Sequence, residues 1–183
     1  MSRILKRIAA GVVIAGVAAL LLAAGGYAAG GYAAGARVNT TKSIPVGLYW
    51  TSSAPVEKGA YVLFCPPQLG VFDDAKERGY IGAGFCQGGY GYMMKRVLAA
   101  KDDAVAVADD GVRVNGELLP LSAPIKADKA GRPLPRYQSN SYTLGNSEVL
   151  LMSDVSATSF DGRYFGPINR SQIKTVIRPV ITW

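Results

Sequence analysis

The chain has 183 residues, 49% of them hydrophobic, and its 20 Lys and Arg against 13 Asp and Glu give a formal net charge of +7. This length supports one compact domain plus accessory segments. The chain has no histidine, so its composition excludes a Ser-His-Asp triad. The basic residues form no Lys/Arg stripe with interleaved aromatics, and we therefore expect no nucleic-acid partner.

The N-terminal segment, residues 1–36, is the first predicted element. No charged residue lies between Arg7 and Arg37; residues 8–22 are strongly apolar, and residues 23–36 form a weaker Gly/Ala/Tyr tract. The stretch exceeds the ~20 residues that a helix needs to cross a bilayer. Two interpretations stay open: a retained membrane anchor, which we favour, and a cleaved signal peptide with Ala-x-Ala sites in the tract.

Basic residues before the apolar stretch predict its orientation. Arg3, Lys6 and Arg7 precede it, and Lys and Arg flanking a membrane helix stay on the cytoplasmic side. We therefore expect the N-terminus to lie in the cytoplasm and residues 37–183 to lie on the outer side of the membrane. Membrane lipid is an expected partner, because a mildly basic exported domain suits anionic headgroups. The alternative is that the basic residues form an ordinary solvated surface.

Cys65 and Cys86 are the only cysteines in the chain. In an exported domain they predict a disulfide that brackets the loop 66–89 and stabilises the fold by roughly 3 kcal/mol. Two thiols without any histidine leave a metal ion incompletely coordinated, so we expect no metal. The disulfide depends on the predicted orientation, since the reverse orientation would place both thiols in a reducing compartment.

From residue 37 onward the chain reads as mainly β. Short runs rich in Val, Ile, Tyr and Phe are separated by Gly, Pro and Asp, as is typical of strands joined by turns. The predicted strands are 46–51, 60–64, 91–98, 104–108, 111–114 and 174–183. Asn115-Gly116 predicts a tight hairpin, because this pair tolerates the positive φ of a type I′ turn.

Two stretches interrupt the strand pattern. Residues 66–89 are Gly-rich, with a short helix predicted over 68–78. Residues 120–146 contain several prolines and little periodicity, which predicts a long loop or a small insertion. Long loops on a β scaffold commonly carry binding specificity. Residues 169–172 predict a single helical turn before the last strand.

Ser43 is the candidate nucleophile. It is followed by Pro45 and Gly47, a spacing that predicts a rigid turn presenting the hydroxyl to a partner. Because the chain has no imidazole, a nucleophilic Ser43 needs a lysine as its base. Taken alone, Ser-x-Pro-x-Gly is also typical of an ordinary turn.

Lys95 is the candidate base. In a strand, Met93, Lys95 and Val97 share one face while Arg96 points the other way. A lysine flanked by apolar residues is suited to burial, which lowers its pKa and makes the amine a usable base near neutrality. The alternative is an edge-strand lysine whose ammonium group reaches water.

The block from Ser159 to Gly166 is the third segment with candidate chemistry. Asp161 and Arg163 invite an ion pair that braces a turn beside the site. Ser159 has a hydroxyl that can accept a hydrogen bond from the lysine. The alternative is a hairpin turn with surface charges.

These segments, in this order, resemble the type I signal peptidases, a family of Ser-Lys serine proteases. The run 39–50 is similar to the conjugal-transfer branch, the TraF-type peptidases, because Ile44-Pro45 stands where ordinary signal peptidases carry Met. Residues 58–64 and the hairpin at Asn115-Gly116 add to a resemblance that covers 39–167. It implies a signal-peptidase-like β-barrel or sandwich preceded by one transmembrane helix.

The resemblance assigns catalytic roles to three residues. Ser43 matches the nucleophile and Lys95 the general base. The side-chain hydroxyl of Thr41 matches one donor of the oxyanion hole, and the backbone N–H of Ser43 is the second.

Supporting roles follow from the same resemblance. Ser159 matches the hydroxyl that positions the lysine, and Asp161 and Arg163 match the bracing pair. Gly162 departs from the pattern, since many relatives carry Ser there, which weakens any hydrogen-bonding role for that position.

The resemblance implies a peptidase without a cofactor, anchored in the inner membrane, with its catalytic domain, residues 37–183, in the periplasm. The implied substrate is the pilin precursor of a conjugative type IV secretion system. Its expected partners are the prepilin polypeptide, inner-membrane lipid and the secretion apparatus. The acyl group passes either to the substrate's own N-terminus, which gives a cyclic pilin, or to water. Two alternatives stay open: a general type I signal peptidase for exported preproteins, and a catalytically inactive scaffold.

Overall fold

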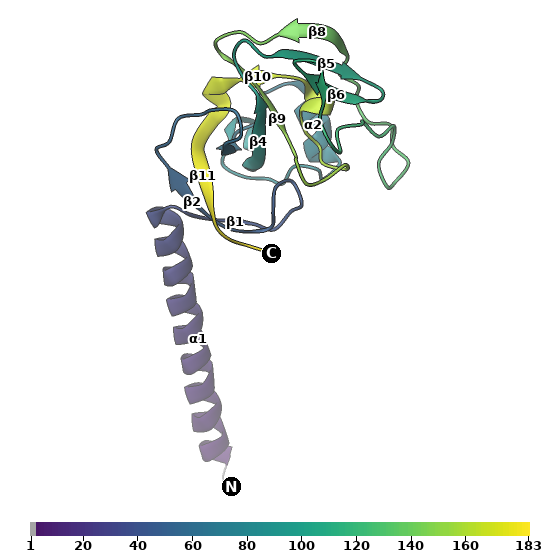
Figure 1. Cartoon of the computed structure of the whole chain (residues 1–183). Coiled ribbons are helices and arrows are strands. Elements are labelled where there is room, and N and C mark those ends of the chain that lie inside the picture. The colour runs from purple at the N-terminus through teal and green to yellow at the C-terminus, as the bar shows by residue number, and fades with distance from the viewer. Residues whose placement is uncertain (1–2) are drawn as a thin grey trace. The chain divides into compact units, whose positions relative to one another are not determined.

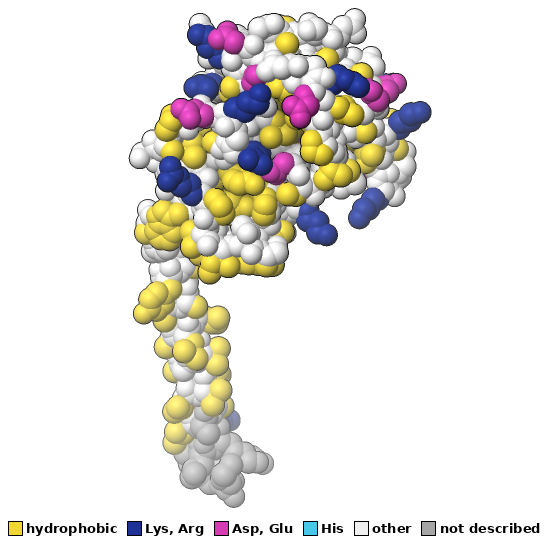
Figure 2. Space-filling view, viewed as in Figure 1, with side chains coloured by type: hydrophobic (Ala, Val, Ile, Leu, Met, Phe, Trp, Pro, Cys, Tyr) yellow, Lys and Arg dark blue, Asp and Glu magenta, His cyan; other side chains and the backbone are white. Residues whose placement is uncertain are grey.

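The computed structural model describes residues 3–183 and divides into two compact units, one ending at Arg37 and one running from Val38 to Trp183. The first unit is helix α1, Arg3–Ala34. Its segment Ala10–Ala34 is 25 residues long with a mean hydropathy of 2.1, which is sufficient by length and composition to cross a membrane. Figure 2 shows hydrophobic side chains along it. The predicted N-terminal apolar helix is confirmed.

The second unit is built from two β-sheets (Figure 1). The larger sheet has the strand order β1-β2-β11-β3-β4-β9-β10, and the smaller has the order β7-β6-β5-β8. The pairings described from β2 onward are antiparallel. The strands of the larger sheet are β1 Ala36–Asn39, β2 Gly47–Ser52, β3 Tyr61–Phe64, β4 Met93–Ala99, β9 Glu148–Met152, β10 Ile168–Asn169 and β11 Ile173–Thr182. Those of the smaller sheet are β5 Ala104–Ala108, β6 Gly111–Val114, β7 Glu117–Leu118 and β8 Ser139–Thr143.

The helices of this unit are short. They are α2 Gly70–Glu77, η1 Gln87–Gly89, α3 Gly162–Phe165 and η2 Arg170–Gln172. The predicted helix over 68–78 and the predicted turn over 169–172 are confirmed as α2 and η2. The predicted fold class, mainly β behind one N-terminal helix, is confirmed as well.

Each of the six predicted strands is present, but β9 was not predicted. Its sequence Glu-Val-Leu-Leu-Met is buried on both faces: Val149 and Leu151 join one hydrophobic cluster, and Leu150 and Met152 join another. A strand covered on both sides carries no alternation of apolar and polar residues. Hydrophobic periodicity therefore does not identify it.

Within residues 120–146, for which a long loop or a small insertion is predicted, Ser139–Thr143 form strand β8, which was not predicted. This strand is almost entirely exposed and pairs only with β5, at the edge of the smaller sheet. An edge strand of Ser, Asn, Tyr and Thr buries no apolar face, so its sequence resembles a loop. Its hydrogen bonds to β5 exist only in the folded chain.

The hairpin between β6 and β7 is confirmed. Asn115 and Gly116 have φ of 53° and 85°, the positive values that a type I′ turn requires. Val114 pairs with Glu117 across the turn.

Strand β4 lies inside the larger sheet, between β3 and β9, and positions the candidate base. Its residues alternate between buried and half-buried, and Met93, Lys95 and Val97 share the buried face, as predicted. Val62 lies opposite Lys95 on β3. Lys95 is therefore held by a paired strand with neighbours on both sides, not by an exposed edge.

The predicted disulfide joins Cys65, which follows β3, to Cys86, which precedes η1, with 5.5 Å between their Cα atoms. The loop that it closes contains α2, which packs Phe72 and Ala75 into the main hydrophobic core. The disulfide therefore fastens a helix-bearing loop to the sheet.

We expect the double variant Cys65→Ser/Cys86→Ser to lose about 3 kcal/mol of unfolding free energy, because a cross-link over a loop of this length restricts the unfolded chain by that amount. Urea unfolding of the full chain in detergent, with and without dithiothreitol, measures it. Reduction should shift the wild-type midpoint to that of the variant and leave the variant unchanged. Equal midpoints for oxidised and reduced wild type would contradict the assignment.

Candidate active site

Ser43 lies in the turn between β1 and β2, and its sequence context explains how the turn is fixed. Ile44 is fully buried in a small hydrophobic cluster with Tyr49. The Tyr49 hydroxyl donates a 2.6 Å hydrogen bond to the carbonyl of Pro45. Gly47, with φ of 156°, packs against the backbone of β11 at Ile181, where a Cβ would collide. The turn is therefore anchored directly after Ser43.

Asn39, at the end of β1, holds the same turn through hydrogen bonds from a buried side chain, a role not predicted from the sequence. Its side chain is 4% exposed, and Nδ2 donates to the carbonyls of Thr41, Ile44 and Pro45 at 2.7, 2.9 and 3.1 Å. Its Oδ1 accepts hydrogen bonds from the Thr41 backbone N–H at 3.2 Å and from the Thr41 hydroxyl at 3.1 Å. An Asn that hydrogen-bonds the backbone two residues ahead is a known turn signal, and that signal was available in the sequence.

The hydroxyls of Thr41 and Ser43 lie 2.9 Å apart. A threonine hydroxyl has one proton to donate. When that proton points to Asn39 Oδ1, the Ser43 hydroxyl donates to the Thr41 oxygen. The structure thus brings the predicted oxyanion donor beside the predicted nucleophile.

Lys95 is buried, with only 3% of its surface exposed. Its Nζ donates a 2.7 Å hydrogen bond to the hydroxyl of Ser159. Burial, the largest effect, lowers the pKa of Lys95 to about 8, while Asp161 raises it and Arg163 lowers it further. The Lys95 amine therefore loses its proton near pH 8, well below the usual range of a lysine. The alternative of an edge-strand lysine does not apply, because β4 lies between β3 and β9.

Asp161 and Arg163 form a fully buried ion pair, so the alternative of surface charges on a hairpin turn is wrong. Arg163 Nε and Nη2 donate to the two carboxylate oxygens of Asp161 at 2.8 and 3.0 Å. Asp161 also caps the helical turn α3. Arg163 uses its remaining donors on three carbonyls, those of Leu121, Ser156 and Ala157.

Gly162, between these two residues, allows a close approach. A Cβ at this position would lie 2.6 Å from Leu150 Cδ1 and 3.0 Å from the carbonyl oxygen of Leu151. Glycine thus lets α3 lie directly on β9, and a serine here would require the Leu150 side chain to shift.

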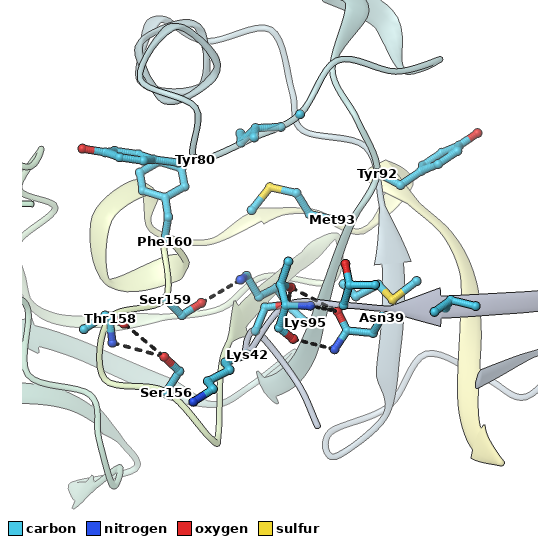
Figure 3. Close-up of a pocket in the computed structure, with 17 residues that line it drawn as sticks. Asn39, Lys42, Tyr80, Tyr92, Met93, Lys95, Ser156, Thr158, Ser159 and Phe160 are labelled. Carbon is cyan, nitrogen blue, oxygen red and sulfur yellow. Dashed lines mark hydrogen bonds between the residues drawn. The ribbon is translucent and has the colours of Figure 1, made fainter. Parts of the chain in front are cut away.

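A cavity of about 390 Å³ brings the candidate residues together (Figure 3). Thr41, Ser43, Lys95 and Ser159 all line it. Figure 3 shows Ser159 and Lys95 facing one another, with Asn39 on the other side of Lys95. In the described part of the chain, Lys95 Nζ is hydrogen-bonded to Ser159, and the Ser43 hydroxyl is hydrogen-bonded to Thr41. Lys95 and Ser43 therefore line the same cavity without a direct hydrogen bond between them.

Asp161 and Arg163 do not line this cavity. They lie behind it and fix the segment that carries Ser159. Among the described residues, His, Cys, Asp and Glu form no group of three or more that could hold a metal ion.

The family description "Signal peptidase, peptidase S26" matches residues 1–183, and the chain belongs to this family of serine peptidases. Within the family it is similar to conjugal-transfer proteins of the TraF type. It is 97% identical over 183 residues to the plasmid transfer protein TraF of Escherichia coli, covering 100% of both chains. It is 35% identical over 149 residues to the conjugal transfer protein TraF of Agrobacterium fabrum, covering 80% of this chain and 82% of that one.

Among solved structures, a signal peptidase I from Enterococcus faecalis aligns with a TM-score of 0.39 and 16% identity, over 69% of this chain and 100% of that chain. The resemblance stated from the sequence, to signal peptidases and to their conjugal-transfer branch, is confirmed by the family match and the relatives.

We expect Asn39→Asp to loosen the turn that carries Ser43, because the carboxylate keeps the acceptor for Thr41 and loses the donor for three carbonyls. A lost hydrogen bond to a buried group costs about 1–3 kcal/mol, which corresponds to at least roughly fivefold faster hydrogen exchange through local opening. Amide hydrogen exchange of residues 40–46 in the full chain measures it. Helix α2 serves as the internal control, and unchanged exchange in 40–46 would contradict the role.

We expect the rate of peptide-bond cleavage to rise with pH through about 8, the pKa of Lys95. Below this value the ammonium form dominates, so the rate should fall roughly tenfold per pH unit, and above it the rate should level off. A pH–rate profile of the cleavage of a peptide substrate measures it. Lys95→Met should lose activity, while Lys101→Met, a change at an exposed lysine, should keep the wild-type profile. A rise centred near 10.5 would show an unperturbed lysine.

Proposed function

We propose that this protein is a membrane-anchored serine endopeptidase with a Ser43–Lys95 dyad that processes the pilin precursor of a conjugative type IV secretion system. One observation carries the proposal. In a chain without histidine, a buried lysine whose pKa is lowered to about 8 lines the same cavity as a serine on an anchored turn. The names of the TraF relatives, which are plasmid and conjugal transfer proteins, support the conjugative setting.

Acylation begins with the neutral amine of Lys95. As Ser43 Oγ attacks the carbonyl carbon of the scissile bond, its proton passes to Lys95 Nζ. The tetrahedral intermediate then collapses, the C–N bond breaks, and Lys95 returns the proton to the leaving amine. The product is an ester between Ser43 and the substrate. Ser159, 2.7 Å from Nζ, orients the amine during both transfers.

The negative charge that develops on the carbonyl oxygen needs donors at fixed positions. The backbone N–H of Ser43 and the hydroxyl of Thr41 supply them, and the hydrogen bonds of Asn39 hold both groups in one turn. Prepositioned donors of this kind are among the largest contributions to acyl-transfer catalysis.

Deacylation decides the product. Attack by water, activated by Lys95, gives a linear chain. Attack by the substrate's own N-terminal amine forms a new peptide bond and gives a cyclic chain. We propose the cyclic outcome for this branch, since an amine held close to the ester acts at a high effective concentration.

The proposed location is the inner membrane, with the catalytic unit in the periplasm. The apolar span of α1 follows basic residues, which favours a cytoplasmic N-terminus. The disulfide Cys65–Cys86 is consistent with an oxidising compartment. Prepilin, membrane lipid and the secretion apparatus are the proposed partners, with no nucleic acid.

The test is co-expression of a candidate prepilin with wild-type protein, Ser43→Ala or Lys95→Ala, followed by mass spectrometry of the pilin. Wild type should give a product lighter by one water than the linear cleaved chain, and both variants should leave the precursor intact. Lys101→Ala is the matched control and should behave as wild type.

Each remaining outcome removes one part of the proposal. Processing that persists in both variants would eliminate the dyad and favour an inactive scaffold beside another peptidase. A linear product alone would remove cyclisation and keep the peptidase. Cleavage of unrelated exported preproteins at the same rate as prepilin would favour a general signal peptidase.

A further inference from the structure

A second cavity of about 390 Å³ lies beside the one that holds Ser43 and Lys95. The 120–146 insertion supplies one side of it, with Ile125 and Leu134 among the lining residues. The segment that follows Ser159 supplies another, with Phe160 and Tyr164. The catalytic mechanism above uses none of these side chains.

The floor of this cavity is aromatic. The rings of Phe160 and Tyr164 are stacked, with centroids 5.8 Å apart and an angle of 6° between their planes. Tyr80 packs against Phe160 with a centroid separation of 5.7 Å. Stacked rings beside Ile125 and Leu134 form an apolar surface that suits an apolar side chain.

Hydrogen bonds hold the insertion over this floor. The Tyr80 hydroxyl donates to Asp128 Oδ2 at 2.6 Å, and Arg132 Nε donates to the same oxygen at 2.7 Å. Arg78 Nη1 donates to the carbonyl of Pro133 at 2.6 Å. The cavity is therefore formed without a ligand. Binding does not have to order the insertion, which lowers the conformational entropy lost on binding.

The rim of the cavity is positively charged. Asp128 is the only carboxylate that lines it, and Arg132 already forms an ion pair with Asp128. Lys129 also lines it, and Lys126 lies on the same insertion; both are exposed, and within the described residues neither has an ion-pair partner. The complementary ligand is apolar with negative charge beside it.

The two cavities share part of their walls. Tyr80, Thr158 and Phe160 line both, and Figure 3 shows Tyr80 and Phe160 side by side beyond Ser159. An extended polypeptide advances about 3.3 Å per residue. A chain that leaves the catalytic cavity past Phe160 therefore reaches the second cavity within a few residues.

We propose that the second cavity is a substrate subsite, remote from the scissile bond, that takes an apolar side chain of the polypeptide substrate with an acidic residue beside it. This rests on the proposed function, since the occupant is the chain that Ser43 cleaves. The insertion then selects substrates while the dyad performs the chemistry.

The binding test uses full-length Ser43→Ala protein in detergent micelles, so that cleavage does not interfere. The probes are three blocked peptides without a cleavage site: acetyl-Leu-Phe-Asp-Glu-amide, acetyl-Leu-Phe-Lys-Lys-amide and acetyl-Ser-Ser-Asp-Glu-amide. The first should shift the backbone amide signals of Lys129, Ala130 and Phe160 in NMR spectra. The second peptide lacks the negative charge and the third lacks the apolar side chains, so each should bind at least roughly fivefold more weakly than the first.

Two substitutions connect the shifts to the cavity. Lys129→Glu reverses a charge at the rim, and Ile125→Ala removes part of the apolar surface of the cavity. Each substitution should weaken the binding of the first peptide roughly fivefold. Lys101→Glu makes the same charge change on the turn between β4 and β5 and should leave binding unchanged. Equal binding of all three peptides, or shifts confined to residues around Ser43, would overturn the proposal. So would equal binding by Lys129→Glu and wild type.

A kinetic test separates this proposal from the function on which it rests. With prepilin as substrate, Lys129→Glu should raise KM several-fold and leave kcat unchanged, because a remote subsite binds ground state and transition state alike. An unchanged KM with active wild type would sink the subsite and leave the dyad intact. If wild type does not cleave prepilin, the proposed function fails, while the peptide shifts still report on the cavity.

Discussion

The buried ion pair between Asp161 and Arg163 holds together the segments that form the walls of both cavities. Two charges inside a protein lose their hydration, and only good geometry and further hydrogen bonds offset that cost. Here the two side chains meet through two hydrogen bonds, and Arg163 also satisfies three carbonyls. One of these carbonyls, that of Leu121, belongs to the 120–146 insertion, so the pair joins the insertion to the segment that carries Ser159.

The same pair reaches the nucleophile turn. Asp161 accepts a 3.0 Å hydrogen bond from the backbone N–H of Ser153, whose hydroxyl makes a long 3.5 Å hydrogen bond to the carbonyl of Lys42. Ser43 follows directly. The electrostatic consequence is equally important: Asp161 and Arg163 act on the pKa of Lys95 in opposite directions, so burial is left as the dominant effect. Desolvation thereby lowers the pKa of Lys95 to about 8.

The sequence predicts those elements whose structure depends on neighbouring residues, and it fails for those that depend on contacts between residues distant in the chain. The helix α1, the hairpin at Asn115-Gly116 and the strand that carries Lys95 follow from local patterns, because hydrophobic periodicity and turn chemistry are properties of neighbouring residues. Strand β9 was missed since both of its faces are covered, and β8 was missed since neither face is. Asn39 carried a turn signal, but its burial beneath the Ser43 turn depends on the packing of that turn against β11.

The sequence by itself determined the chemistry available to this protein: no histidine, a serine on a Pro-Gly turn, a lysine between apolar residues on a strand, and an apolar N-terminal helix. Only the tertiary structure decided which alternatives hold. It buried Lys95 inside a sheet, turned the Asp161-Gly162-Arg163 motif into an internal brace, and formed a second cavity beside the first from the insertion. Burial, and with it the pKa of a lysine, is a property of residues distant in the chain that meet only on folding.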